Sequence, residues 1–93
     1  MKFSKKICVQ MAERLGVNLD VVGVDQWCRG MNVELEHGRR NEFTNVTNND
    51  PFVTAHIALA HLLEFPNYYD GLQAMETVLD EQWKGKKKPN VLF

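Results

Sequence analysis

The sequence predicts an all-α protein, a small bundle of about four helices, from three observations. Apolar residues recur every three to four positions along four segments, and each segment ends near a glycine or a proline. No run of alternating apolar and polar residues has a convincing strand partner. A chain of 93 residues with 44% hydrophobic and 25% charged residues can bury one core. We therefore expect a single helical domain over residues 1–84 and a basic C-terminal tail over residues 85–93.

The first helix is predicted to begin near Ser4, because serine is a favoured N-cap residue. Its apolar side has helical spacing and consists of Ile7, Cys8, Met11, Ala12 and Leu15. Gly16 is expected to end the helix in the left-handed αL conformation, and Val17 is placed for the hydrophobic contact of a Schellman motif. Residues 18–20 are then expected to turn the chain.

The second helix is harder to assign. A good amphipathic stripe is formed by Val24, Trp27, Cys28, Met31 and Leu35. Gly38 is the expected left-handed end, and His37 lies in the last turn. Gly30 lies in the interior, where glycine costs about 1 kcal/mol relative to alanine. Residues 31–36 also alternate as a strand would, but only residues 43–47 are near enough to pair with them. We therefore favour a helix.

The third helix follows a polar loop over residues 38–50. Asp50 as N-cap and Pro51 at the first helical position make a favoured helix start. The helix is expected to run to about Phe65, because Pro66 disfavours helical geometry in the residue before it. One broad apolar face is predicted from Ala55, Ala58, Leu59, Leu62 and Leu63.

The fourth helix is predicted to restart at Asn67 and to end at Gly85. Its apolar stripe has clean helical spacing and consists of Tyr68, Leu72, Met75, Leu79 and Trp83. Trp27 and Tyr69 lie on or beside such stripes too. We interpret these aromatic residues as core rather than as a platform for stacking nucleic acid bases.

Charge is unevenly distributed along the chain. The seven lysines lie at the two ends, as Lys2, Lys5, Lys6, Lys84, Lys86, Lys87 and Lys88. Residues 7–83 hold twelve acids and four arginines, a formal charge of 4 − 12 = −8. Such an acidic body argues against binding to duplex nucleic acid, except through the basic tail. A protein partner or self-association is expected instead.

Two cysteines are too few for a disulfide framework, so Cys8 and Cys28 are expected to pack as small hydrophobic residues. That expectation favours a reducing compartment. The sequence has no apolar run long enough to span a bilayer and does not begin as a signal peptide does. Together these features predict a cytoplasmic protein that is not inserted in a membrane.

The residues best suited to bind a ligand or carry out chemistry are two histidine–carboxylate pairs. Glu34 and His37 stand three apart, and His61 and Glu64 repeat that spacing in reverse order. Side chains at this spacing share one side of a helix, as in carboxylate-bridged metal sites of helical bundles. These four residues are therefore candidate ligands for a divalent transition metal such as iron, manganese or zinc. Glu36 is expected to orient a ligating histidine without binding the metal itself.

Two alternatives explain the same residues without a metal. The carboxylates and histidines could be solvated helix ends, or a buried hydrogen-bond network could join His37 and Glu64 to Tyr68 or Tyr69. Neither the cysteines nor the histidines form a readable catalytic pocket, so an enzymatic activity is uncertain and not favoured.

Three blocks occur in order along the chain, namely GMNVELEHG, TNVT and ALAHLLEFPNYY. In these blocks the chain resembles a family of small uncharacterised proteins found in bacteria, phages and large DNA viruses, and the resemblance covers about residues 24–79. It places the five candidate residues, Glu34, Glu36, His37, His61 and Glu64, at motif positions of the family. It implies a shared fold but brings no activity with it.

The sequence as a whole favours a small non-catalytic binding or structural protein with an acidic body. A viral or phage accessory protein, in the host cytoplasm or in a virion, is compatible with the resemblance. The alternative is a metal-binding helical bundle that uses the paired Glu and His residues, with hydrolytic or oxygen chemistry.

Overall fold

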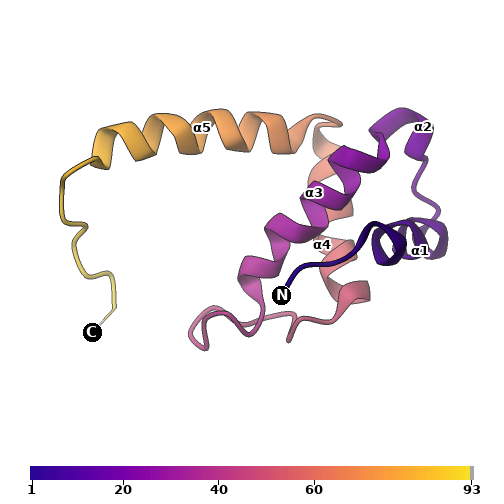
Figure 1. Cartoon of the computed structure of the whole chain (residues 1–93), viewed down its shortest axis with the longest axis horizontal. Helices are drawn as coiled ribbons and strands as arrows, with labels where there is room; N and C mark the ends of the chain where they lie inside the picture. The colour runs from indigo at the N-terminus through magenta and orange to yellow at the C-terminus, as the bar shows by residue number, and fades with distance from the viewer. Residues whose placement is uncertain (93) are drawn as a thin grey trace.

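The computed structural model describes residues 1–92, and over these residues the fold is all-α, as predicted (Figure 1). The helices are α1 (Lys5–Leu15), α2 (Leu19–Val22), α3 (Val24–Glu34), α4 (Pro51–Glu64) and α5 (Tyr68–Trp83), with a 3₁₀ turn, η1 (Leu35–His37), after α3. Four of the five α-helices are the ones that the periodicity predicts. The last residue of the predicted basic tail, Phe93, lies outside the described residues.

Helix α1 begins and ends through local chemistry. The Ser4 side chain accepts a hydrogen bond from the backbone N–H of Ile7 at 3.2 Å. Gly16 adopts φ +74°, and the Val17 N–H donates to the Ala12 carbonyl at 2.9 Å. These bonds confirm the predicted N-cap and Schellman end.

The predicted turn after α1 is itself a single helical turn, α2. Asn18 caps it by accepting from the Asp20 N–H at 3.0 Å. Gly23, with φ +83°, separates α2 from α3, a conformation that favours glycine.

Helix α3 continues into η1, which excludes the strand alternative for residues 31–36. The predicted left-handed end at Gly38 is wrong, because its φ is −100°. Glycine is required there for a different reason. A Cβ atom at Gly38 would collide with the Asn49 side-chain oxygen, the same oxygen that accepts from the Arg39 N–H at 2.9 Å.

The core lies where α1, α3 and α4 pack together. Its buried side chains are Phe3, Cys8, Met11, Ala12, Trp27, Met31, Leu35, Ala55, Ala58, Leu62 and Tyr69. Trp27 is fully buried and donates its indole N–H to the Cys8 carbonyl at 2.7 Å. On α4, the polar residue Thr54 is also buried, and its hydroxyl donates to the Asp50 carbonyl at 2.6 Å. Leu63, predicted to be in the core, is exposed.

Cys8 and Cys28 form a disulfide that joins α1 to α3. The expectation of two separate thiols packed as hydrophobic residues is therefore wrong. The error arose because a count of two cysteines does not reveal whether the fold brings them together. Closing a loop between residues 20 apart in the sequence stabilises a chain by about 3 kcal/mol in the loop-entropy treatment.

Helix α5 extends away from the body that the other helices form, and the tail continues beyond it (Figure 1). The Cα radius of gyration is 14.6 Å, whereas a compact domain of this length has about 12 Å. Tyr69 is the buried residue of α5. The prediction of a buried apolar stripe is wrong for its distal part, since Met75, Leu79 and Trp83 are 52%, 41% and 38% exposed. Within the described part of the chain, no helix is both long enough and apolar enough to cross a membrane.

Candidate functional site

The structure brings Glu34, His37 and His61 together where α3, η1 and α4 meet. Glu34 ends α3 and is 3% exposed, which is unusual for a carboxylate. Its Oε1 lies 3.6 Å from the Nε2 of His37, and its Oε2 lies 3.9 Å from the Nε2 of His61. Both imidazoles thus face one buried carboxylate at distances too long for hydrogen bonds.

The two remaining candidate residues lie farther out. Glu64 is exposed, and its Oε1 is 3.8 Å from the Nδ1 of His61. An α-helix would direct the adjacent side chains of Glu36 and His37 about 100° apart, yet the Oε1 of Glu36 is 3.4 Å from the Nε2 of His37. The α-helical projection fails there because residues 35–37 form a 3₁₀ turn, which has three residues per turn.

Two tyrosines complete the arrangement. The Tyr69 hydroxyl donates to Oε2 of Glu34 at 2.7 Å in a buried hydrogen bond. Tyr68 stacks on His61, with ring centroids 4.2 Å apart and an interplanar angle of 8°. We call the set Glu34, His37, His61, Tyr68 and Tyr69 the junction cluster. The buried hydrogen bond of this cluster joins Tyr69 to Glu34, whereas the network expected from the sequence joined His37 and Glu64 to a tyrosine.

Tyr69 also explains the glycine in the middle of α3. A Cβ atom at Gly30 would lie 2.9 Å from Cδ2 of the Tyr69 ring, closer than packed carbon atoms approach. The ring therefore rests directly on the helix backbone. This interior glycine, one turn before Glu34, was the sequence signal for an incoming aromatic side chain.

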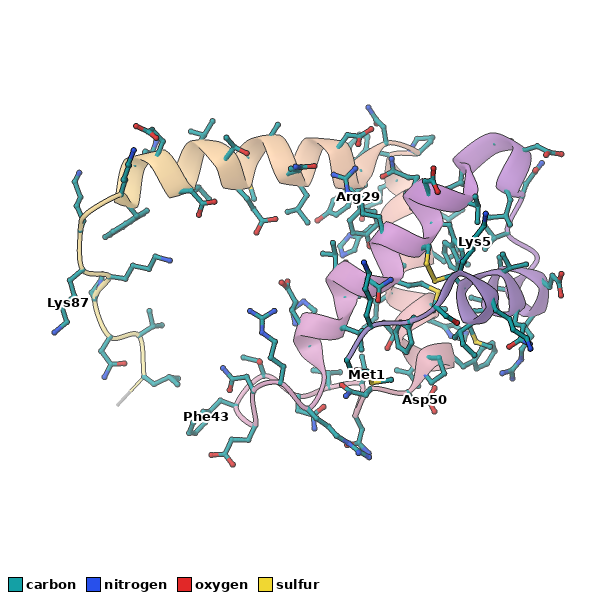
Figure 2. All side chains as sticks on the ribbon, viewed as in Figure 1. Met1, Lys5, Arg29, Phe43, Asp50 and Lys87 are labelled. Carbon is teal, nitrogen blue, oxygen red and sulfur yellow. A yellow bond between two sulfur atoms is a disulfide. The ribbon has the colours of Figure 1, made fainter. Side chains whose placement is uncertain are left out.

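A row of polar residues on α3 holds the first turns of α5. Arg29 forms an ion pair with Asp70 at 2.6 Å and donates to Gln73 at 2.7 Å. Gln26 accepts from the Tyr69 N–H at 3.2 Å and donates to Asp70 at 3.3 Å. In Figure 2, Arg29 lies beneath the start of α5. We call the α3 residues Gln26, Arg29, Gly30 and Glu34 the α5 clamp.

Burial raises the pKa of Tyr69 far above its usual value, and the hydrogen bond to the Glu34 carboxylate raises it further. Unfolding restores an ordinary tyrosine pKa of about 10. Above about pH 10 the unfolded chain therefore loses a proton that the folded chain keeps, and stability falls by about 1.4 kcal/mol per pH unit from this group.

We expect this loss to be measurable as the difference between wild type and Tyr69→Phe. Denaturant unfolding between about pH 9 and pH 11, around the ordinary tyrosine pKa, should show a steeper fall for wild type. Equal slopes for the two proteins would contradict the raised pKa of Tyr69, since the other titrating groups are common to both.

The chemistry available to the junction cluster is hydrogen bonding, proton exchange and ligation by imidazole or carboxylate. Over residues 1–92, no group of three or more His, Cys, Asp or Glu side chains is arranged so that it could hold a metal ion. The Nδ1 atom of His61 is buried and has no hydrogen-bond partner. The cluster opens to solvent mainly at His37, whose side chain is half exposed.

Fold and site together define a small all-α protein with a histidine, glutamate and tyrosine cluster at a helix junction. The chain belongs to the family described as "Protein of unknown function (DUF5661)", whose profile matches residues 8–78. The matched segment contains the junction cluster, the α5 clamp and most of α5. No curated protein matches the chain. No solved structure matches it either.

Proposed function

We propose that this protein is a non-catalytic binding protein that presents the apolar side of α5 to a protein partner. The observation that carries the proposal is the contrast along α5 itself. Its first turns are held to α3 by the α5 clamp, and its distal turns extend beyond the body with apolar side chains exposed (Figure 1). A helix held at one end in this way is positioned for docking at the other.

The apolar side chains of α5 form one continuous stripe that is half-buried against the body at Tyr68 and Leu72 and exposed from Met75 onward. We call Tyr68, Leu72, Met75, Leu79 and Trp83 the α5 stripe; at about 100° per residue these positions fall within one narrow sector of the helix. A groove of about 280 Å³ continues it at the proximal end, lined by Phe65, Asn67, Tyr68, Gly71, Leu72 and Met75. Contiguous exposed apolar surface of this kind is typical of interaction sites, and an amphipathic helix is a common docking element.

The junction cluster supports this proposal as a structural element. Glu34 and Tyr69 bind each other in the buried interior, and Tyr69 packs on Gly30. The family motif residues in the GMNVELEHG and ALAHLLEFPNYY blocks thereby serve the attachment of α5. A buried network that fixes one orientation of two helices accounts for these residue types without a reaction.

The test uses the double substitution Met75→Glu and Leu79→Glu. We expect this variant to fold normally, because both side chains are exposed, and to lose a partner that wild-type protein recovers from its native cells and binds again when purified. Thr77→Glu is the control, since it adds a negative charge on the opposite side of α5. Recovery that is equal for all three proteins would overturn the proposal.

A viral or phage accessory role is compatible with such a binding protein. Within that role, the disulfide between Cys8 and Cys28 favours an oxidising location such as a virion over the reducing cytoplasm expected from the sequence. The identity of the partner recovered in the experiment above tests the role.

A metal-binding function is the second candidate, and one observation favours it. The separations of 3.6 and 3.9 Å between the Glu34 oxygens and the two Nε2 atoms approach the spacing of about 3.4 Å between ligands that hold one zinc at about 2.1 Å. A small side-chain adjustment would let Glu34, His37 and His61 bind one divalent ion, with Glu64 and Glu36 nearby.

Isothermal titration of metal-free protein with zinc, iron(II) or manganese(II) tests this candidate. It predicts one ion per chain, lost in His37→Ala and in His61→Ala, with a metal-dependent rise in stability. His56→Ala is the control, because His56 lies on the exposed side of α4 and bonds the Phe52 carbonyl. Absence of saturable binding in the wild type would exclude the candidate.

A further inference from the structure

We propose that the partner covering the α5 stripe is a second copy of this chain, paired antiparallel through α5. The inference rests on the proposed function, because it names the occupant of the same surface. Three features carry it: the charges of α5 and its tail, the register of the stripe, and the groove at the proximal end of α5.

The charges of α5 and of the tail are equal and opposite. Helix α5 holds four acids and no basic residue, namely Asp70, Glu76, Asp80 and Glu81. Four lysines follow at once, as Lys84, Lys86, Lys87 and Lys88; Lys84, which ends α5 next to residues 85–93, is counted with the tail here. An antiparallel pair brings each tail, with a charge of +4, to the acidic α5 of the other copy. A parallel pair would bring the two tails together, and like charges repel.

The apolar residues fit an antiparallel register centred on Thr77. Residues equally distant from the centre then lie level across the pair. Met75 and Leu79 are each two residues from Thr77, so Met75 of each copy faces Leu79 of the other copy. Trp83 and Gly71, each six residues from Thr77, also lie level. The largest side chain of the stripe therefore lies level with a residue without a side chain.

The groove at the proximal end of α5 provides the space for that tryptophan. Gly71 is one of its lining residues, and a Cβ atom at Gly71 would have no neighbour within 4 Å. In the isolated chain the groove is therefore open to solvent. In the pair, Trp83 of each copy fills the groove of the other, which makes the interface self-complementary as a two-fold dimer requires.

The same register brings Lys84 level with Asp70 of the second copy, each seven residues from Thr77. Within one chain these residues are separated by 14 positions, or about 21 Å along a helix. The Asp70 and Glu64 side chains are both well exposed and accessible to a second tail. Figure 2 shows the tail, with Lys87, at the distal end of α5, away from the body of its own chain.

Sedimentation velocity over a concentration series tests the pairing. Two helices of 16 residues, each about 24 Å long, form an interface at the small end of the known range, so a micromolar dissociation constant is expected. We expect Met75→Glu to weaken the dimer at least about tenfold and added salt to weaken it further. Thr77→Glu should leave it within about threefold of wild type, as a surface charge away from an apolar contact does. A wild-type protein that stays monomeric throughout would overturn the inference.

Zero-length carbodiimide crosslinking tests the orientation. With equal amounts of isotopically light and heavy protein, mixed crosslinks between the tail lysines and Asp70 or Glu64 are expected. Mixed crosslinks confined to the tail lysines and the distal acids Asp80 and Glu81 would indicate a parallel pair and overturn the inference.

The two proposals can fail separately. If purified wild-type protein is monomeric but another protein binds it in a manner that depends on Met75 and Leu79, the second-copy inference is wrong and the proposed function stands. If the double substitution changes neither self-association nor any other binding, both are wrong.

Discussion

Tyr69→Ala is expected to lower the free energy of unfolding by about 3–5 kcal/mol, as deletion of a buried aromatic side chain does. Tyr69 is 1% exposed and rests on Gly30 of α3. Without its ring, α5 keeps the stacking of Tyr68 on His61 and the solvent-exposed polar contacts of Arg29 and Gln26. Such contacts contribute little in water. Denaturant unfolding followed by circular dichroism measures the loss.

Tyr69→Phe separates the hydrogen bond from the packing. The ring stays, but the buried Glu34 carboxylate loses the hydroxyl that donates to it at 2.7 Å. Leaving a buried acceptor unpaired costs about 1–3 kcal/mol. Tyr68→Phe is the matched control, because it keeps the stacking on His61 and should stay within about 0.5 kcal/mol of wild type. If the two phenylalanine variants were equally stable, the hydrogen bond between Tyr69 and Glu34 would not stabilise the fold.

The ends of the helices were predictable because they depend on neighbouring residues. Ser4 caps α1, Gly16 ends it, and Asp50 caps α4 by accepting from two backbone N–H groups. The burial of α5 was not predictable in this way. Periodicity shows that one side of a helix is apolar, but it cannot show whether that side is covered by the same chain or by another molecule.

The junction cluster was predictable only in part, for the same physical reason. Glu34 and His37 share a helix side by their spacing alone. Tyr69, which donates to Glu34, lies 35 residues further along the chain, and Asp70, which pairs with Arg29 of the α5 clamp, lies 41 residues from it. Contacts between distant segments depend on how helices cross, which the pattern of one helix does not encode. Likewise, the disulfide required knowledge that α1 and α3 lie side by side.

Gly30→Ala is expected to destabilise the protein by about 1–3 kcal/mol, although alanine is the better helix former by about 1 kcal/mol. The new Cβ would lie 2.9 Å from Cδ2 and 3.0 Å from Cζ of Tyr69. The ring is buried and bonded to Glu34, so it cannot turn aside as an exposed side chain would. Helix α5 must move instead. Denaturant unfolding measures the cost, and solution scattering should detect a changed radius of gyration.

Gly71→Ala is the matched control, because it makes the same substitution inside α5 where a Cβ atom meets nothing within 4 Å. At dilutions where the protein is monomeric, we expect it to stabilise the chain by about 0.5–1 kcal/mol. The helix propensity gain is common to both variants. The difference between them therefore isolates the contact of Gly30 with Tyr69. Two changes of the same sign would mean that this contact does not set the position of α5, and the role assigned to the α5 clamp would be lost.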